Sequence, residues 1–224
     1  YIKILPWDRI IIVTTSKAYK EEIIKELPNL PSENIIVEPA RRNTAPAHGL
    51  GALFISKKDK DAIIMTSPVD HLVGPDDKYL KTIEIAAQVA YEDKVLVTVG
   101  VKPTYPHVGY GYIKKGDVYK SISDRRIYKV RQFTEKPELA KAVKFVKSGK
   151  YVWNTSQFVW RADVLLQALK TYSADIYNLL DKIGESIGTE KEESVIADSY
   201  EKMPELAIDY AVAERAKNFC LVEA

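Results

Sequence analysis

The sequence is poor in the features that would place it in several large classes of protein. Its single cysteine, Cys220, cannot form a disulfide within the chain, so a reducing, cytoplasmic location is expected. No apolar run approaches the roughly 20 residues of a membrane helix, and no signal segment opens the chain. The 33 basic and 31 acidic residues leave a net charge of +2, which gives no electrostatic footprint for nucleic acid. Neither a membrane nor a nucleic acid is therefore an expected partner.

Glycine is also scarce and is not gathered into a phosphate-binding loop. The ten glycines form neither a GxGxxG motif nor a P-loop. What remains is an ordinary globular composition, with 46% hydrophobic and 29% charged residues. A length of 224 residues suits one large domain or two small ones.

Short apolar runs alternate with amphipathic segments over the first hundred residues. Strands are predicted at 10–14, 35–37, 62–66 and 95–99, and helices between Ser16 and Pro28, from Thr44 to about Ser56, and from about Asp76 to Tyr91. Ser16 and Thr44 are the expected N-caps of the first two helices. This alternation predicts an α/β fold, with a Rossmann-like, mostly parallel sheet flanked by helices.

The pattern changes after Gly100. Segments 109–113 and 126–133 are predicted to be antiparallel strands joined through a polar turn at 114–120. A helix at 138–148, with Gly149 as its C-cap, leads to a strand at 152–160. The remainder is predicted to be mainly helical, at 162–172, 174–183, 191–200 and 209–217, before a strand that opens at Phe219. An antiparallel part is therefore expected to follow the parallel part.

Asp70 and His71 lie just beyond the end of the apolar run 62–65. In open α/β sheets, ligands collect past the carboxyl ends of such strands, where an acidic side chain is a natural cation ligand. The alternative is that Asp70 is a turn residue and His71 a half-buried imidazole. Position favours a site, because the loop 38–47 and the loop from Gly100 also follow buried strands.

The loop EPARRNTAPA, residues 38–47, runs into a predicted helix start at Asn43 and Thr44. Backbone amides at a helix start favour an anionic or polar ligand. Arg41 and Arg42 add positive charge, although a solvated pair of arginines is the alternative. Asn43 and Thr44 could act as helix caps alone, but capping is compatible with ligand contact.

Several glycines and polar residues in the second half are candidates for contact with a ligand. Gly109 and Gly111 would weaken a strand unless a backbone or a ligand must approach closely. Glu135 can accept from two sugar hydroxyls and Lys136 is a compact charge suited to phosphate, the alternative being a surface ion pair. Asn154, inside an apolar strand, needs partners for its amide.

Six motifs occur in order along the chain: EPxxRNTAPA, PxDH, PTxPxxGYGYI, FxEKP, WNxxxF and IDYAVxE. From about Arg9 to Val222, the sequence thereby resembles the nucleotidyltransferase domain of the mannose-1-phosphate guanylyltransferase family. The resemblance implies a GT-A-like nucleotidyltransferase fold with an antiparallel sugar-binding part. The implied reaction uses Mg²⁺ and converts GTP and mannose 1-phosphate to GDP-mannose and pyrophosphate.

The resemblance also implies an organisation and roles for single residues. It implies one partial domain over residues 1–224, in which a nucleotide-binding part covers about 1–104 and a sugar-phosphate-binding part covers about 105–224. It also allows a homodimer. Two residues are expected to act in catalysis: Asp70, as the metal-binding aspartate, and Lys136, as the holder of the sugar phosphate. The expected nucleotide-binding residues are Arg42, Asn43 and Thr44. The expected sugar-binding residues are Gly111, Glu135 and Asn154.

The chain departs from the family pattern in several places. The family's glycine-rich N-terminal loop and its segment with a second metal aspartate are not found in the given sequence, so the chain by itself is expected to turn over little. His107-Val108 replaces glutamate-threonine, and Thr155-Ser156-Gln157 replaces serine-glycine-methionine. These changes leave open a non-catalytic, sugar-nucleotide-binding regulatory subunit, or the same chemistry on another sugar 1-phosphate or nucleotide.

Overall fold

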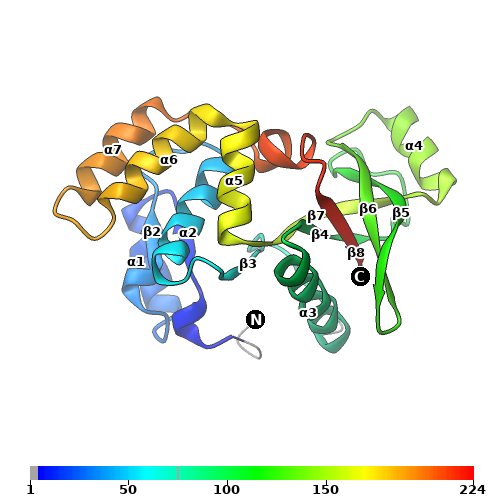
Figure 1. Ribbon diagram of the computed structural model, residues 1–224, viewed down its shortest axis with the longest axis horizontal. Coiled ribbons are helices and arrows are strands. Elements are labelled where there is room, and N and C mark those ends of the chain that lie inside the picture. Colours follow the sequence, from blue (N-terminus) through cyan, green and yellow to red (C-terminus); the bar gives the residue numbers. More distant parts are fainter. Residues whose placement is uncertain (1–4, 75) are drawn as a thin grey trace.

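The fold is built on a six-stranded mixed sheet with helices on both faces and a pair of short parallel strands beside it (Figure 1). The computed structural model describes residues 5–74 and 76–224. The strands are β1 (Ile12–Thr14), β2 (Ile35–Val37), β3 (Ile63–Thr66), β4 (Leu96–Val101), β5 (Tyr112–Ile122), β6 (Arg125–Thr134), β7 (Tyr151–Arg161) and β8 (Phe219–Glu223). The helices are α1 (Lys17–Glu26), α2 (Thr44–Lys58), α3 (Asp76–Asp93), α4 (Leu139–Ser148), α5 (Ala162–Tyr172), α6 (Ala174–Ser186) and α7 (Glu192–Lys202). Short helical segments are η1 (Trp7–Arg9), η2 (Ser32–Asn34) and the π-helix η3 (Asp209–Ala213).

The order of the strands is β3-β7-β4-β8-β6-β5. β4 pairs in parallel with β8, as β1 does with β2, whereas β7 pairs antiparallel with both β3 and β4. β3, β4 and β8 therefore run in one direction, and the α/β class with helices flanking the sheet is confirmed. Among the described residues, the one parallel pairing of the six-stranded sheet is β4 with β8. β7 returns from the antiparallel half and inserts between β3 and β4, and β6 pairs antiparallel with β8, so the sheet is mixed and not mostly parallel in its pairing.

Neighbouring residues of the central strands enter different cores on the two faces of the sheet. On β7, Phe158 and Trp160 belong to a buried cluster shared with α2, α5 and α6, while Val159 belongs to one shared with α3. On β8, Leu221 and Cys220 divide in the same way. This alternation is the two-residue period of a strand. Because both faces are covered, β4 and β8 have mainly apolar sequences, with Thr98 as a buried polar exception in β4.

Most helix boundaries lie close to their predicted positions. Ser16 caps α1 by accepting from the Tyr19 N–H at 3.1 Å, as predicted. Gly149 ends α4 in a left-handed conformation with a φ of 64°, which glycine adopts without steric cost. Among the described residues, none of the helices combines the length and the apolar character needed to cross a bilayer.

Two predictions in the second half are wrong. The segment 114–120 is not a turn, because β5 continues through it and shifts of register with β6 accommodate its extra residues. The chain turns instead after β5, where Ser123 has a φ of 53°. The helix predicted at 209–217 is confined to the short π-helix η3, whose first residue, Asp209, accepts a hydrogen bond from Asn154 of β7. In Figure 1 the β5–β6 hairpin and α4 lie at one end of the molecule, α6 and α7 lie at the other, and α5 is near the middle.

Candidate functional site

Four residues from separate elements meet around Asn154 of β7, and we call them the Asn154 cluster: Gly111, Glu135, Asn154 and Asp209. Asn154 is buried, and its Nδ2 donates to Asp209 Oδ1 at 2.7 Å while its backbone N–H donates to Gly111 O at 2.8 Å. A Cβ at Gly111 would meet the carboxylate end of Glu135 and lie 3.2 Å from Asn154 Cβ, so an added side chain would displace Glu135 and crowd Asn154. The three predicted sugar-binding residues are thus brought together, and their contact with a sugar stays a prediction.

Burial raises the pKa of both acidic residues of the Asn154 cluster. Desolvation raises the pKa of Glu135, and the nearby charge of Asp209 raises it further. Desolvation also raises the pKa of Asp209. Carboxylates accept hydrogen bonds, so this cluster suits a ligand rich in hydroxyl donors.

Lys136 lies at the exposed rim beside the Asn154 cluster. Its side chain is 66% exposed, and its Nζ lies 3.7 Å from Glu135 Oε1. An exposed pair at this distance contributes at most about 1 kcal/mol, so little holds the ammonium away from an incoming anion. The position suits a phosphate contact, which stays a prediction.

The start of α2 is held by Asn43 and not, as predicted, by Thr44. Asn43 Oδ1 accepts from the Thr44 N–H at 2.9 Å. Asn43 has a φ of 65° and a ψ of −168°, a conformation used almost only by glycine. Thr44 is the first helical residue, and its Oγ1 accepts from the Ile208 N–H at 2.9 Å. Contact of Asn43 and Thr44 with a nucleotide stays a prediction.

The guanidinium of Arg42 is directed toward the C-terminal turn of α7. Its Nε donates to Tyr200 O at 2.9 Å and its Nη2 to Glu201 O at 3.0 Å. A positive charge at the last carbonyls of a helix stabilises that end. This role is not expected from the sequence, and nucleotide binding by Arg42 stays a prediction.

Asp70 and His71 are exposed in the loop after β3, where the neighbouring side chains of Val69 and Leu72 are almost fully exposed. Within the described part of the chain, no three His, Cys, Asp or Glu residues gather into a group that could hold a metal. Mg²⁺, however, keeps several waters and binds through one or two carboxylates together with substrate phosphates. A single exposed carboxylate at the carboxyl end of β3 therefore fits as one protein ligand.

Backbone strain occurs at the same loops. In the described chain, non-glycine residues with positive φ include Asn43 at 65°, Lys136 at 41° and Ser156 at 53°. Such conformations cost on the order of 1–3 kcal/mol each and concentrate at functional sites. Lys94 at 52° and Ser123 at 53° also have positive φ and lie outside the predicted site, so the strain is shared by the site and by other turns.

Glu38 and Tyr200 form a buried pair that the sequence analysis misses. The Tyr200 hydroxyl donates to Glu38 Oε1 at 2.8 Å, and both residues are buried. Burial raises the pKa of Glu38 to about 7, and the hydrogen bond from Tyr200 opposes this shift. Asp209 is missed as well. The motif IDYAVxE could have indicated Asp209, and the position directly after β2 could have indicated Glu38.

An aromatic group occupies the region of the His107-Val108 departure. His107 stacks on Tyr110 with ring centroids 3.9 Å apart, and Tyr105 and Tyr110 contact Trp153 edge-on at 5.1 and 5.3 Å. Trp153 and Asn154 are consecutive in β7, so their side chains leave opposite faces of the strand. The aromatic group therefore lies across β7 from the side chain of Asn154.

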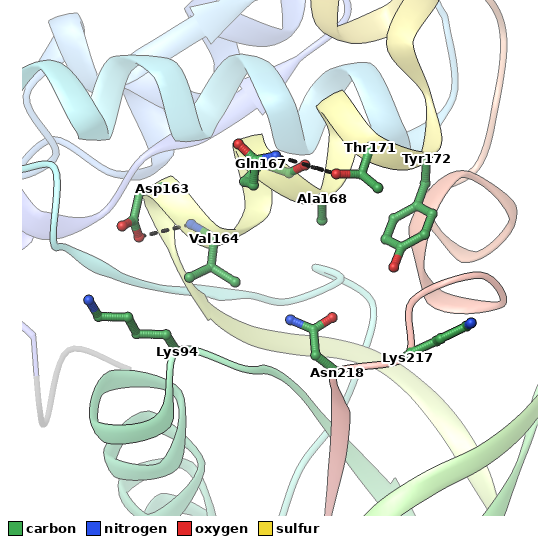
Figure 2. Close-up of a pocket in the computed structure, with 9 residues that line it drawn as sticks. All are labelled: Lys94, Asp163, Val164, Gln167, Ala168, Thr171, Tyr172, Lys217 and Asn218. Atoms are coloured by element: carbon green, nitrogen blue, oxygen red, sulfur yellow. Dashed lines mark hydrogen bonds between the residues drawn. The ribbon is translucent and has the colours of Figure 1, made fainter.

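A groove of about 550 Å³ lies at the amino ends of β4 and β8 (Figure 2). Lys94 and Asn218, just before these strands, form one wall, and α5 forms the other. Asp163 in that wall is already paired with Arg161 through a 2.6 Å hydrogen bond. The groove contains none of the predicted site residues, and Asp70 follows the carboxyl end of β3, which is the end of the sheet opposite to the groove.

A mixed sheet flanked by helices, as found here, is an arrangement of the nucleotidyltransferase class. A solved structure agrees: a Thermus thermophilus protein described as a mannose-1-phosphate geranyltransferase superposes with a TM-score of 0.84, at 25% identity, over 99% of this chain and 61% of that one. The pattern of the nucleotidyl transferase family matches residues 4–198, and the chain belongs to this family.

Two further similarities extend this assignment. A mannose-1-phosphate guanylyltransferase of Escherichia coli K12 is 36% identical over 209 residues, which cover 90% of this chain and 42% of that protein. A Helicobacter pylori structure described as a mannose-6-phosphate isomerase is 28% identical, with a TM-score of 0.76 over 96% of this chain and 82% of that one. The chain therefore spans less than half the length of the E. coli relative. Members of the family generally use a divalent metal, which agrees with the exposed carboxylate of Asp70.

Proposed function

We propose that the chain forms the nucleotidyltransferase part of a mannose-1-phosphate guanylyltransferase, which joins mannose 1-phosphate to GTP and releases pyrophosphate. The observation that carries this proposal is the Asn154 cluster, in which buried acceptors lie beside the exposed ammonium of Lys136. Acceptors next to a cation are what a phosphorylated sugar requires. The activity named for the E. coli relative supports the same reaction.

The chemistry of this reaction sets what the protein must do. The attacking oxygen of a sugar 1-phosphate is already anionic, so no general base is needed. The obstacles are repulsion between phosphates and poor alignment, which bound cations and positioned donors relieve. Mg²⁺ would neutralise charge shared by the reacting phosphates, and Asp70 would hold it.

The residues of the chain divide between the two substrates. Glu135 and Asn154 orient the sugar through its hydroxyls, and Lys136 offsets the charge of its phosphate. Asn43 fixes the start of α2, so that the amides there meet the nucleotide. Arg42 contributes by securing this loop to α7 and by the positive charge it brings to it.

The test is an Asp70→Asn variant of the full-length protein, with pyrophosphate release as the assay. Loss of one preorganised electrostatic group lowers the rate by about 10²–10³. Because Asp70 is exposed, the thermal midpoint should change little. Asp77→Asn, which alters another exposed acid nearby on α3, is the matched control. Near-normal turnover by Asp70→Asn would refute its metal role.

A substrate panel tests the identity of the reaction. GTP with mannose 1-phosphate is expected to give the highest kcat/KM among common nucleoside triphosphate and sugar 1-phosphate pairs. A clear preference for another pair would support the same class of reaction but would show that the proposed substrates are wrong. Binding of GDP-mannose without turnover by the intact protein would favour a regulatory subunit instead.

A further inference from the structure

A ladder of hydrogen bonds joins the loop before α2 to the segment that follows Tyr200. We call this second segment, residues 200–209, the strap. The backbone N–H of Leu206 donates to Arg42 O at 3.2 Å, and the backbone N–H of Ala45 donates to Leu206 O at 3.0 Å. The strap therefore follows the start of α2 closely, although about 160 residues separate the two in sequence.

The first end of the strap is anchored by buried and charged groups. Tyr200 is fully buried, and its hydroxyl donates to Glu38 Oε1 at 2.8 Å. The guanidinium of Arg42 holds the carbonyls of Tyr200 and Glu201. Hydrogen bonds with a charged donor are stronger than neutral ones, so this end is fixed to the loop.

The second end of the strap leads directly into the Asn154 cluster. The Ile208 N–H donates to Thr44 Oγ1 at 2.9 Å, and Ile208 is 1% exposed. The next residue is Asp209, whose Oδ1 accepts from Asn154 Nδ2. A buried amide needs an acceptor, and Thr44 supplies it. The hydroxyl oxygen of Thr44 thus fixes the backbone position from which Asp209 reaches the cluster.

We propose that Thr44 is a positioning residue for the Asn154 cluster: by accepting from Ile208, it holds Asp209 in place for the sugar phosphate. This proposal rests on the proposed function and deepens it. In this proposal the side chain of Thr44, which lies in the loop expected to bind the nucleotide, affects the binding of mannose 1-phosphate. The Thr44 N–H donates to Asn43 Oδ1, so the backbone and the side chain of Thr44 serve two different contacts.

The deciding experiment compares Thr44→Val with Thr44→Ser in the full-length protein. Valine has the shape of threonine without its acceptor, whereas serine keeps the oxygen. Leaving one buried amide unpaired should raise the KM for mannose 1-phosphate about tenfold. The KM for GTP should change less than about threefold, and Thr44→Ser should restore most of the affinity. Thr171→Val, which removes a threonine hydroxyl bonded within α5, is the control.

A double-mutant cycle with Asp209→Ala, which removes the acceptor for Asn154, separates this mechanism from a general structural effect. If Thr44 acts through Asp209, Thr44→Val should weaken mannose 1-phosphate binding by less than about twofold in the Asp209→Ala background. Additive effects, or a rise confined to the KM for GTP, would overturn the proposal. If Thr44→Val does not fold, Thr44→Ala replaces it in the same cycle. If the wild-type protein does not turn over these substrates, that result counts against the proposed function instead. The double-mutant cycle is then measured as the Kd of mannose 1-phosphate for each variant.

Discussion

Replacing Glu38 by glutamine should make the protein less sensitive to alkaline pH. Burial raises the pKa of this carboxyl from 4.5 to about 7, so the folded state binds its proton more tightly than the unfolded state does. The stability it provides is complete below pH 4.5 and is lost as the pH rises toward 7. Each pKa unit corresponds to about 1.4 kcal/mol, so the free energy of unfolding should fall by roughly 3 kcal/mol in total.

The measurement is the free energy of unfolding in urea, for wild type and Glu38→Gln, at pH 5 and pH 8. Glutamine retains an acceptor for the Tyr200 hydroxyl and cannot ionise. The difference between variant and wild type should shift by roughly 2–3 kcal/mol in favour of the variant between the two pH values. Any loss of stability caused by the new amide itself is nearly the same at pH 5 and at pH 8, so it cancels when the two pH values are compared. Glu33→Gln, at an exposed neighbour, should show no such shift. A pH-independent difference for Glu38→Gln would refute the reasoning.

Two further substitutions test the geometry of the loops. Gly111→Ala should lower the free energy of unfolding by about 1–3 kcal/mol and weaken mannose 1-phosphate binding, because the new Cβ displaces Glu135 and Asn154. Gly74→Ala, where a Cβ meets nothing within 4 Å, is its control, and equal effects would contradict the argument. Asn43→Gly should keep or raise stability by about 1 kcal/mol, since relief of strain outweighs a lost cap, while GTP affinity falls. Destabilisation in urea would show that the backbone at Asn43 is not strained.

Local signals explain how much of the fold could be predicted. The apolar run at 35–37, the cap at Ser16 and the C-cap at Gly149 are each decided by a few neighbouring residues, and all three agree with the structure. The turn predicted at 114–120 fails for the same reason. Its polar composition is local, whereas bulged pairing with β6 is what keeps the segment in a strand.

Long-range contacts explain what the sequence could not supply about the site. Gly111, Glu135 and Asn154 stand out because glycine, a charge or an amide is unusual at a strand or its end. Asp209 and Tyr200 lie in helical segments, where an acid or an aromatic residue is ordinary. Their importance comes from partners 55 and 162 positions away, and no periodicity within one segment contains that information.

The strained helix start and the strap are two parts of one arrangement. The Asn43 conformation costs on the order of 1–3 kcal/mol and persists only where the surroundings determine it. Here the cap to Thr44, the Arg42 contacts with α7 and the Thr44 bond from Ile208 surround it on both sides. Each such bond contributes about 1 kcal/mol net, so together they can offset the strain. One of these bonds, from the Ile208 N–H to Thr44 Oγ1, lies directly before Asp209. A contact that helps to hold the nucleotide-side loop in its strained form therefore also helps to place a carboxylate in the Asn154 cluster.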